Sequence, residues 1–86
     1  MKYNTEEIYD KLLVAIENSG IDIPESIPDD LDLTEYISDS LQFVSLVINI
    51  EEELGIVLPD DFLLIDNFHS LTGLVNQLHE LVETYK

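Results

Sequence analysis

The chain has 86 residues, of which 19 are acidic and only 3 are lysine or arginine, so its formal net charge is −16. Such a charge repels nucleic-acid phosphates and anionic lipid headgroups, so we expect neither nucleic acid nor an anionic membrane surface as a partner. The length suits one domain, residues 1–86, and a hydrophobic content of 45% is ordinary for a folded chain. The absence of cysteine excludes disulfides and thiolate metal sites. No signal core or membrane span is apparent, so we expect a cytoplasmic protein without membrane insertion.

The first predicted element is a helix over about residues 5–18. Asn4 or Thr5 can cap its start, and Gly20 is a natural terminator. Its apolar residues recur at helical spacing and predict one buried stripe, widened by two neighbours. The stripe is Ile8, Leu12, Ala15 and Ile16, and the neighbours are Tyr9 and Leu13.

Residues 19–39 break the helical pattern, because Pro24 and Pro28 interrupt it and no alternation supports a strand. Apolar residues nevertheless recur along the whole segment. They are Ile21, Ile23, Ile27, Leu31, Leu33, Tyr36 and Ile37. We therefore expect an ordered strap lying over the core, with a short helical turn near residues 33–37.

The second predicted helix covers about residues 40–54 and ends at Gly55. On a helical wheel, one arc is expected to face the core and the opposite arc to face solvent. The core arc is Phe43, Leu46, Val47, Ile50 and Leu54. The solvent arc is Gln42, Ser45, Asn49, Glu52 and Glu53.

Leu41, Val44 and Ile48 form a third row on the shoulder of this helix nearest Ser40. Two interpretations of this apolar row remain open. Either the strap covers it as ordinary core, or it stays accessible between acidic neighbours and another protein docks there. The acidic neighbours are Asp39, Glu51 and Glu52.

A short helical segment is expected around residues 60–65, and a last helix begins after the capping residue Ser70 and extends toward Tyr85. The residues of the last helix expected to point inward are Leu71, Leu74, Val75, Leu78, Leu81 and Val82. The predicted fold is therefore all-α, a small antiparallel four-helix bundle with three main helices and one short helix.

Ser40 stands at the start of the second helix, and its hydroxyl admits several interpretations. It can cap the helix, as can its neighbours Ser38 and Asp39, although only one of the three can occupy the cap position. It can be a catalytic nucleophile, but that chemistry needs a base, and only His69 and His79 could serve. Nothing in the sequence places either histidine beside Ser40, so no catalytic residue is expected.

Covalent attachment is the third interpretation of Ser40. A phosphodiester at a helix N-terminus meets free backbone N–H groups and the positive end of the helix dipole, and a separate enzyme would perform the chemistry. A metal site is not expected. The acidic run from Asp30 resembles the start of a calcium loop, but Glu35 and Leu41 stand where the loop needs glycine and glutamate.

The motif Asp39–Ser40–Leu41, followed by VSLVINIEEELGIVLPDD, resembles the acyl carrier protein and peptidyl carrier protein family. The likeness spans the chain, from the first helix to the final helix opened by HSL. It implies a carrier without catalytic activity of its own, with 4′-phosphopantetheine from coenzyme A attached to Ser40. The thiol of that arm would hold an acyl or aminoacyl group as a thioester and pass it between enzymes.

The resemblance also implies partners. They are a phosphopantetheinyl transferase, a loading ligase or adenylation enzyme, and a downstream synthase or transferase with a basic docking surface. We expect a monomer that meets these enzymes one at a time. The positions assigned to docking are Asp39, Leu41, Gln42, Val44, Ile48, Glu51, Glu52, Asp60 and Asp61.

Three positions depart from the usual pattern of the family. Ile37 stands where many members have glycine, and Gln42 and Ser45 stand where the fatty-acid type carries acids. The segment DDFLLIDNFHSL is also more apolar than in fatty-acid carriers. These departures favour a specialised pathway, such as polyketide, nonribosomal peptide or D-alanyl transfer, over housekeeping fatty-acid synthesis. The alternative is an unmodified, acidic, carrier-like adaptor that acts only by docking to other proteins.

Overall fold

The computed structural model describes residues 3–28 and 30–84. Within these residues the chain forms three α-helices and three short 3₁₀ turns, and no strand. In chain order they are α1 (Thr5–Asn18), η1 (Leu33–Glu35), α2 (Ser40–Leu54), η2 (Asp60–Phe62), η3 (Ile65–Phe68) and α3 (Leu71–Thr84). The all-α fold is confirmed, and the observed bounds of α1 and α2 agree with the predicted ones.

The short fourth helix of the predicted bundle is divided into the two turns η2 and η3. The expected turn near residues 33–37 is present as η1. Tyr85, toward which the last helix was expected to extend, lies outside the described residues. No helix among the described residues has the length and apolar character needed to cross a bilayer.

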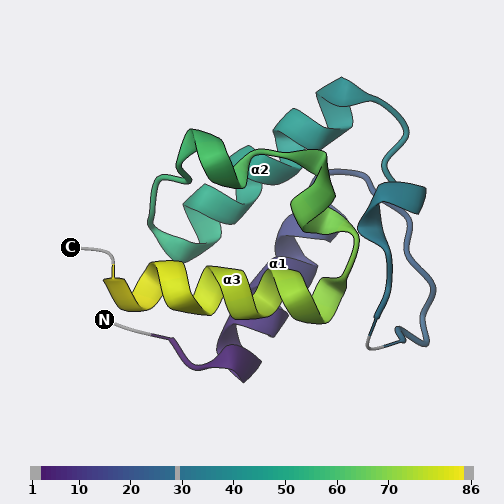
Figure 1. Ribbon diagram of the computed structural model, residues 1–86. Helices are drawn as coiled ribbons and strands as arrows, with labels where there is room; N and C mark the ends of the chain where they lie inside the picture. Colours follow the sequence, from purple (N-terminus) through teal and green to yellow (C-terminus); the bar gives the residue numbers. More distant parts are fainter. Residues whose placement is uncertain (1–2, 29, 85–86) are drawn as a thin grey trace.

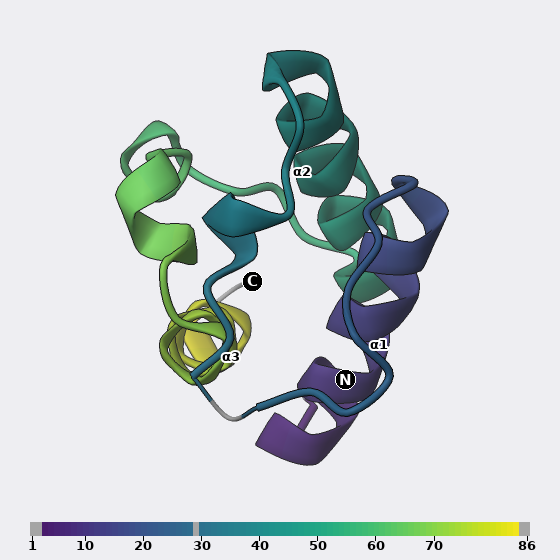
Figure 2. The ribbon, with the colours of Figure 1, turned by 90° about the vertical axis from the view of Figure 1, so that its right-hand side faces the viewer.

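The three α-helices pack in two directions. Figures 1 and 2 show α1 and α2 lying side by side and running in opposite directions, whereas α3 crosses them steeply and is seen nearly end-on in Figure 2. The blue strap that follows α1 passes along one end of the molecule, where η1 contacts η3. The start of α2 therefore lies at the end of the bundle where the strap and the η3 turn meet.

Local capping explains where α1 begins and where α2 ends. The side chain of Asn4 accepts the Glu7 N–H while the Glu7 carboxylate accepts the Asn4 N–H, so α1 begins with a reciprocal capping box. Gly55 ends α2 in the left-handed conformation at φ +67°, and its N–H donates to the Glu51 carbonyl at 2.8 Å. Only glycine adopts this conformation without steric cost, so it is the natural stop for α2.

One apolar cluster unites the helices with the strap. The whole predicted stripe of α1 is buried, and Ile21, Leu31 and Leu33 of the strap belong to the same cluster. The Leu71 N–H donates to the Leu31 carbonyl at 2.8 Å and joins the strap to the first residue of α3. The expectation of an ordered strap over the core is thus confirmed. Two predicted inward residues, Phe43 and Leu81, are only half-buried.

Two glycine substitutions test the role of the left-handed stop. Gly55→Ala should lower the free energy of unfolding by about 1 kcal/mol, because its added methyl group meets open space and only the backbone conformation is penalised. Gly73→Ala in α3 should instead raise it by about 0.5 kcal/mol, because a helical glycine costs conformational entropy. Urea denaturation of both variants gives the comparison, and equal destabilisation by the two would contradict this account.

Candidate functional site

Ser40 is the first residue of α2, and its side chain is exposed. Asp39 occupies the cap position, because its Oδ1 accepts the Gln42 N–H at 2.9 Å. Among residues 3–28 and 30–84, no hydrogen bond engages the Ser40 hydroxyl. Of the three candidate caps, the middle one therefore does the capping, and the hydroxyl that follows it remains accessible.

The backbone at the start of α2 has donors to spare for an anion. The first hydrogen bond inside the helix runs from the Phe43 N–H to the Asp39 carbonyl at 3.2 Å. The N–H groups of Ser40 and Leu41 precede that bond and have no acceptor in the helix. Together with the positive end of the helix dipole, they favour a phosphate oxygen near the Ser40 side chain.

A hollow of about 370 Å³ opens directly beside Ser40. Its lining residues are Thr34, Ile37, Asp39, Ser40, Phe43 and Ile65. One wall is the first turn of α2, and the other walls come from the η1 region and from the first residue of η3. An exposed hydroxyl, free backbone donors and an adjoining apolar hollow together fit a phosphodiester-linked organic group.

The sequence did not predict that Thr34 and Ile65 lie beside Ser40, because Ile65 is distant from it along the chain and Thr34 belongs to a separate element, η1. The signal that could have identified this region is the apolar run at residues 62–65. Leu64 and Ile65 are 59% and 45% exposed, whereas Phe62 in the same run is buried. Apolar side chains left exposed in a short turn indicate a surface that contacts something else.

His69 joins the η1 and η3 regions that form the outer walls of this hollow. Its Nδ1 lies 3.1 Å from Asp32 Oδ2 and 3.3 Å from Thr34 Oγ1, and its Nε2 lies 3.5 Å from Asp66 Oδ1. Asp32 also caps η1 by accepting the Thr34 N–H at 2.9 Å, and it accepts the Thr34 hydroxyl. We call these four side chains the His69 clasp.

The clasp shifts two pKa values in opposite directions. The hydrogen bond from the Thr34 hydroxyl and then the one to His69 lower the pKa of Asp32 below 3.8. The hydrogen bond to Asp32 raises the pKa of His69 above 6.5, with smaller contributions from the charges of Asp32 and Asp66. His69 is therefore committed to the clasp, and the structure does not bring it to the Ser40 hydroxyl as a base.

The side of α2 that was expected to face solvent instead ties this helix to the end of α1. Gln42 Oε1 accepts the Ser38 N–H at 2.7 Å, and Gln42 Nε2 donates to the Gly20 carbonyl at 2.9 Å. Asn49 Nδ2 donates to Ser19 Oγ at 2.8 Å. Gln42 and Asn49 are thus half-buried members of the arc expected to face solvent, and their amides also bond to neighbouring segments because an amide carries both donors and an acceptor.

The apolar row of α2 is accessible rather than covered by the strap. Leu41, Val44 and Ile48 are 77%, 50% and 48% exposed, and we call them the α2 ridge. Asp39 and Glu52 beside it are exposed as well. The remaining acidic positions assigned to docking differ among themselves. Asp60 and Asp61 are exposed in η2, whereas Glu51 is half-buried and its Oε2 accepts the Leu58 N–H at 2.8 Å.

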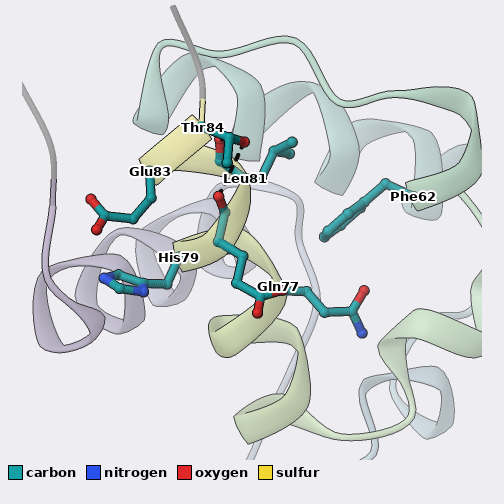
Figure 3. A pocket seen from close by; sticks show the side chains of 7 residues that line it. Phe62, Gln77, His79, Leu81, Glu83 and Thr84 are labelled. Atoms are coloured by element: carbon teal, nitrogen blue, oxygen red, sulfur yellow. Dashed lines mark hydrogen bonds between the residues drawn. The ribbon is translucent and has the colours of Figure 1, made fainter.

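Another hollow, about 690 Å³, lies along the end of α3. Figure 3 shows His79 and Glu83 on one side of that helix and Phe62 and Gln77 on the other, so these polar groups do not converge on one point. Within residues 3–28 and 30–84, no three or more histidine, aspartate or glutamate side chains form a group that could hold a metal ion.

Comparison with known proteins gives one match. A family model described as a phosphopantetheine attachment site matches residues 12–78, a stretch that contains α2 and the hollow beside Ser40. No curated protein and no solved structure matches the chain.

The His69 clasp should give the protein a characteristic pH dependence. Because the pKa of His69 is raised in the fold, its contribution to stability is complete below 6.5 and is lost as the pH rises through the raised value. Because the pKa of Asp32 is lowered, its contribution is present above 3.8 and is lost as the pH falls through the lowered value. The clasp should therefore stabilise most between these two limits.

Thermal denaturation of the wild type and of His69→Gln over a pH series tests this expectation. The difference in melting temperature should be largest inside the window and should shrink toward both sides. Taking the difference removes the effect of the overall negative charge, which both proteins share. A difference that stays constant across the series would contradict the proposed ion pair.

Proposed function

The chain belongs to the phosphopantetheine-attachment-site family, and from that premise we propose that this carrier protein holds its prosthetic group on Ser40. Domains of this family carry a covalently attached 4′-phosphopantetheine and are generally not catalytic. The single observation that carries the assignment to Ser40 is its free, exposed hydroxyl at the first turn of α2, next to an open apolar hollow. We propose that residues 1–86 act as one carrier domain.

The attachment reaction needs little from this chain beyond presentation of the hydroxyl. The Ser40 oxygen forms a bond to the phosphorus of coenzyme A that bears the pantetheine arm. The bond from that phosphorus to the adenosine bisphosphate leaving group breaks, and the hydroxyl proton passes to a base of the transferase. Asp39 holds the first turn in helical geometry, and the N–H groups of Ser40 and Leu41, which have no acceptor in the helix, would favour the phosphate left on the serine.

When attached, the arm supplies a thiol on which an acyl or aminoacyl group is carried as a thioester. The contribution of this chain is to fix the root of the arm. Gln42 ties the segment just before Ser40 to the end of α1 through Ser38 and Gly20. The serine is therefore presented from a rigid helix end, which limits the orientations in which a partner enzyme meets the arm.

The α2 ridge supports docking to partner enzymes. Its three apolar side chains lie on the exposed surface of the helix that begins with Ser40, and exposed Asp39 and Glu52 lie beside them. A partner with an apolar patch surrounded by lysine and arginine would match both features. We propose a phosphopantetheinyl transferase, an enzyme that loads the acyl or aminoacyl group, and a downstream synthase or transferase as such partners, met one at a time by a monomer.

A specialised biosynthetic pathway is the finer proposal. Gln42 has a structural role here, so this helix presents an amide engaged in hydrogen bonds where the fatty-acid type presents a docking charge. Ser45 is exposed and uncharged. A partner that relied on acids at these two positions would find neither. The second candidate function is an unmodified acidic adaptor, supported by the exposed ridge, which would dock to proteins without any arm.

Intact mass after modification separates these two functions. The protein is incubated with coenzyme A, magnesium and a broad-specificity phosphopantetheinyl transferase. The wild type and Ser38→Ala should gain the mass of one phosphopantetheine, whereas Ser40→Ala should gain none. Ser38 is the matched control because it is also exposed and lies two residues away. An unmodified wild type, or a modified Ser40→Ala variant, would remove the proposal in favour of the adaptor or another attachment residue.

The ridge is tested by introducing a charge into it. Val44→Asp or Ile48→Asp should lower kcat/KM of the transferase for this carrier by about tenfold, the usual size of the loss of one interface anchor. The melting temperature should change little, because both side chains are about half exposed.

Val14→Asp is the matched control for the ridge, because Val14 is a helical valine of similar exposure, 43%, on α1. It should leave the transferase rate unchanged. If the ridge variants unfold, or if the Val14 variant slows the reaction equally, the ridge is not a docking surface.

A further inference from the structure

Resting on the proposed attachment at Ser40, we propose that the hollow beside it is a binding site for the pantoyl unit of the protein's own arm. The pantoyl unit is a branched apolar group that bears a hydroxyl and directly follows the phosphate. In this assignment the hollow holds the root of the arm and does not hold the acyl or aminoacyl cargo. The α2 ridge then stays available to partner enzymes.

The apolar character of the hollow comes from three side chains on three different elements. Ile37 follows η1, Phe43 lies in the first turns of α2, and Ile65 begins η3. Ile37 and Phe43 are half-buried, and Ile65 is 45% exposed. Phe43 is held from behind by an edge-to-face contact with the fully buried Phe68, at 5.0 Å between ring centroids. The floor of the hollow is therefore rigid, while its rim still exposes apolar surface to water.

The position of Ser40 determines which part of the arm can fill this hollow. Ser40 itself is one of the lining residues. Outward from the phosphate, the arm has a methylene group, then a quaternary carbon with two methyl groups, and then a carbon that bears the hydroxyl. The first apolar group on the arm thus lies close to the point of attachment. The thiol is at the opposite end, and a cargo there would have to fold back past the whole arm to reach the same surface.

Thr34 provides the polar partner that the pantoyl hydroxyl needs. The Thr34 hydroxyl donates its proton to Asp32, and even with His69 Nδ1 3.3 Å away its oxygen keeps a lone pair that can accept a hydrogen bond. The Thr34 side chain lines the hollow together with the three apolar side chains. A branched group with one adjacent hydroxyl is complementary to this combination of apolar surface and one acceptor.

The His69 clasp keeps the two outer walls at a fixed separation. Thr34 is in the η1 region and Ile65 is in η3, and His69 contacts Asp32 before the first and Asp66 within the second. The hollow is thus already formed without the arm, and binding the pantoyl unit requires little rearrangement. Burying the exposed rim of Ile65 under the two pantoyl methyl groups supplies a hydrophobic driving force.

Methyl NMR of the modified protein tests this assignment. The protein is produced with isotope-labelled isoleucine methyl groups and converted with unlabelled coenzyme A, and intact mass confirms that every molecule carries the arm. Nuclear Overhauser effects are expected from the pantoyl methyl protons to the methyl groups of Ile37 and Ile65. Ile48, which is similarly exposed at 48% but belongs to the α2 ridge, should show none.

Two matched variants complete the design. Ile65→Ser should abolish the nuclear Overhauser effect between the pantoyl methyl protons and the methyl groups of Ile37. It should also return the pantoyl methyl resonances to the positions of free pantetheine. Ile48→Ser should leave both unchanged. The assignment is overturned if the wild-type arm shows free pantetheine resonances, or if Ile37 and Ile65 shift only after an acyl group is loaded, since the hollow would then hold cargo. Neither result affects the attachment itself, which fails separately if the mass does not increase.

Discussion

Phe68 is the side chain on which the structure around Ser40 depends. It is fully buried, and its ring makes edge-to-face contacts with Phe43 of α2 at 5.0 Å and with Phe62 of η2 at 6.2 Å. Each such contact contributes about 0.5–1.5 kcal/mol beyond the burial of area. Because the three rings come from α2, η2 and η3, one aromatic cluster holds two short turns against the helix that presents Ser40. Turns of three and four residues have too few internal hydrogen bonds to hold that position alone.

Polar contacts near Ser40 add to the support that this aromatic cluster gives to the start of α2. The Asp39 cap and the Gln42 bridge orient the start of α2, and the Asn49 bond to Ser19 continues the connection to α1. The His69 clasp is accessible to solvent, so water and salt weaken its ion pairs. It therefore contributes to the position of the η1 and η3 walls of the hollow more than to the stability of the core. The site therefore combines a rigid floor with a rim in which the pKa of His69 is raised by its hydrogen bond to Asp32.

The α2 ridge combines exposed apolar side chains with neighbouring acidic side chains. Lys11 is the one lysine within the described residues, and its ammonium lies 4.9 Å from the centroid of the Tyr3 ring. Among the described residues, no lysine pairs with the acids around the ridge. In the proposed docking, a basic partner enzyme would supply the missing charge, and salt should slow that association because exposed charges are screened. The apolar ridge is then the part of the contact that salt leaves intact.

The sequence by itself determined the helices and the place of Ser40, because these depend on local chemistry. Helical spacing, the Asn4 cap and the glycine stop at Gly55 act within a few residues, and both α1 and α2 have the expected bounds. It could not decide whether the strap covers the α2 ridge, since that depends on how three helices pack together.

Only the tertiary structure placed Thr34 and Ile65 beside Ser40 and turned Gln42 toward α1. The contacts of Ile65 with the Ser40 region and of Gln42 with Gly20 join residues more than twenty positions apart, and Thr34 reaches Ser40 across the bend between η1 and α2. No periodicity or capping rule reaches over that distance, because each of those rules describes neighbours along the chain. The proposed attachment residue, Ser40, could therefore be selected from the sequence, while the hollow beside it exists only through the packing that surrounds Phe68.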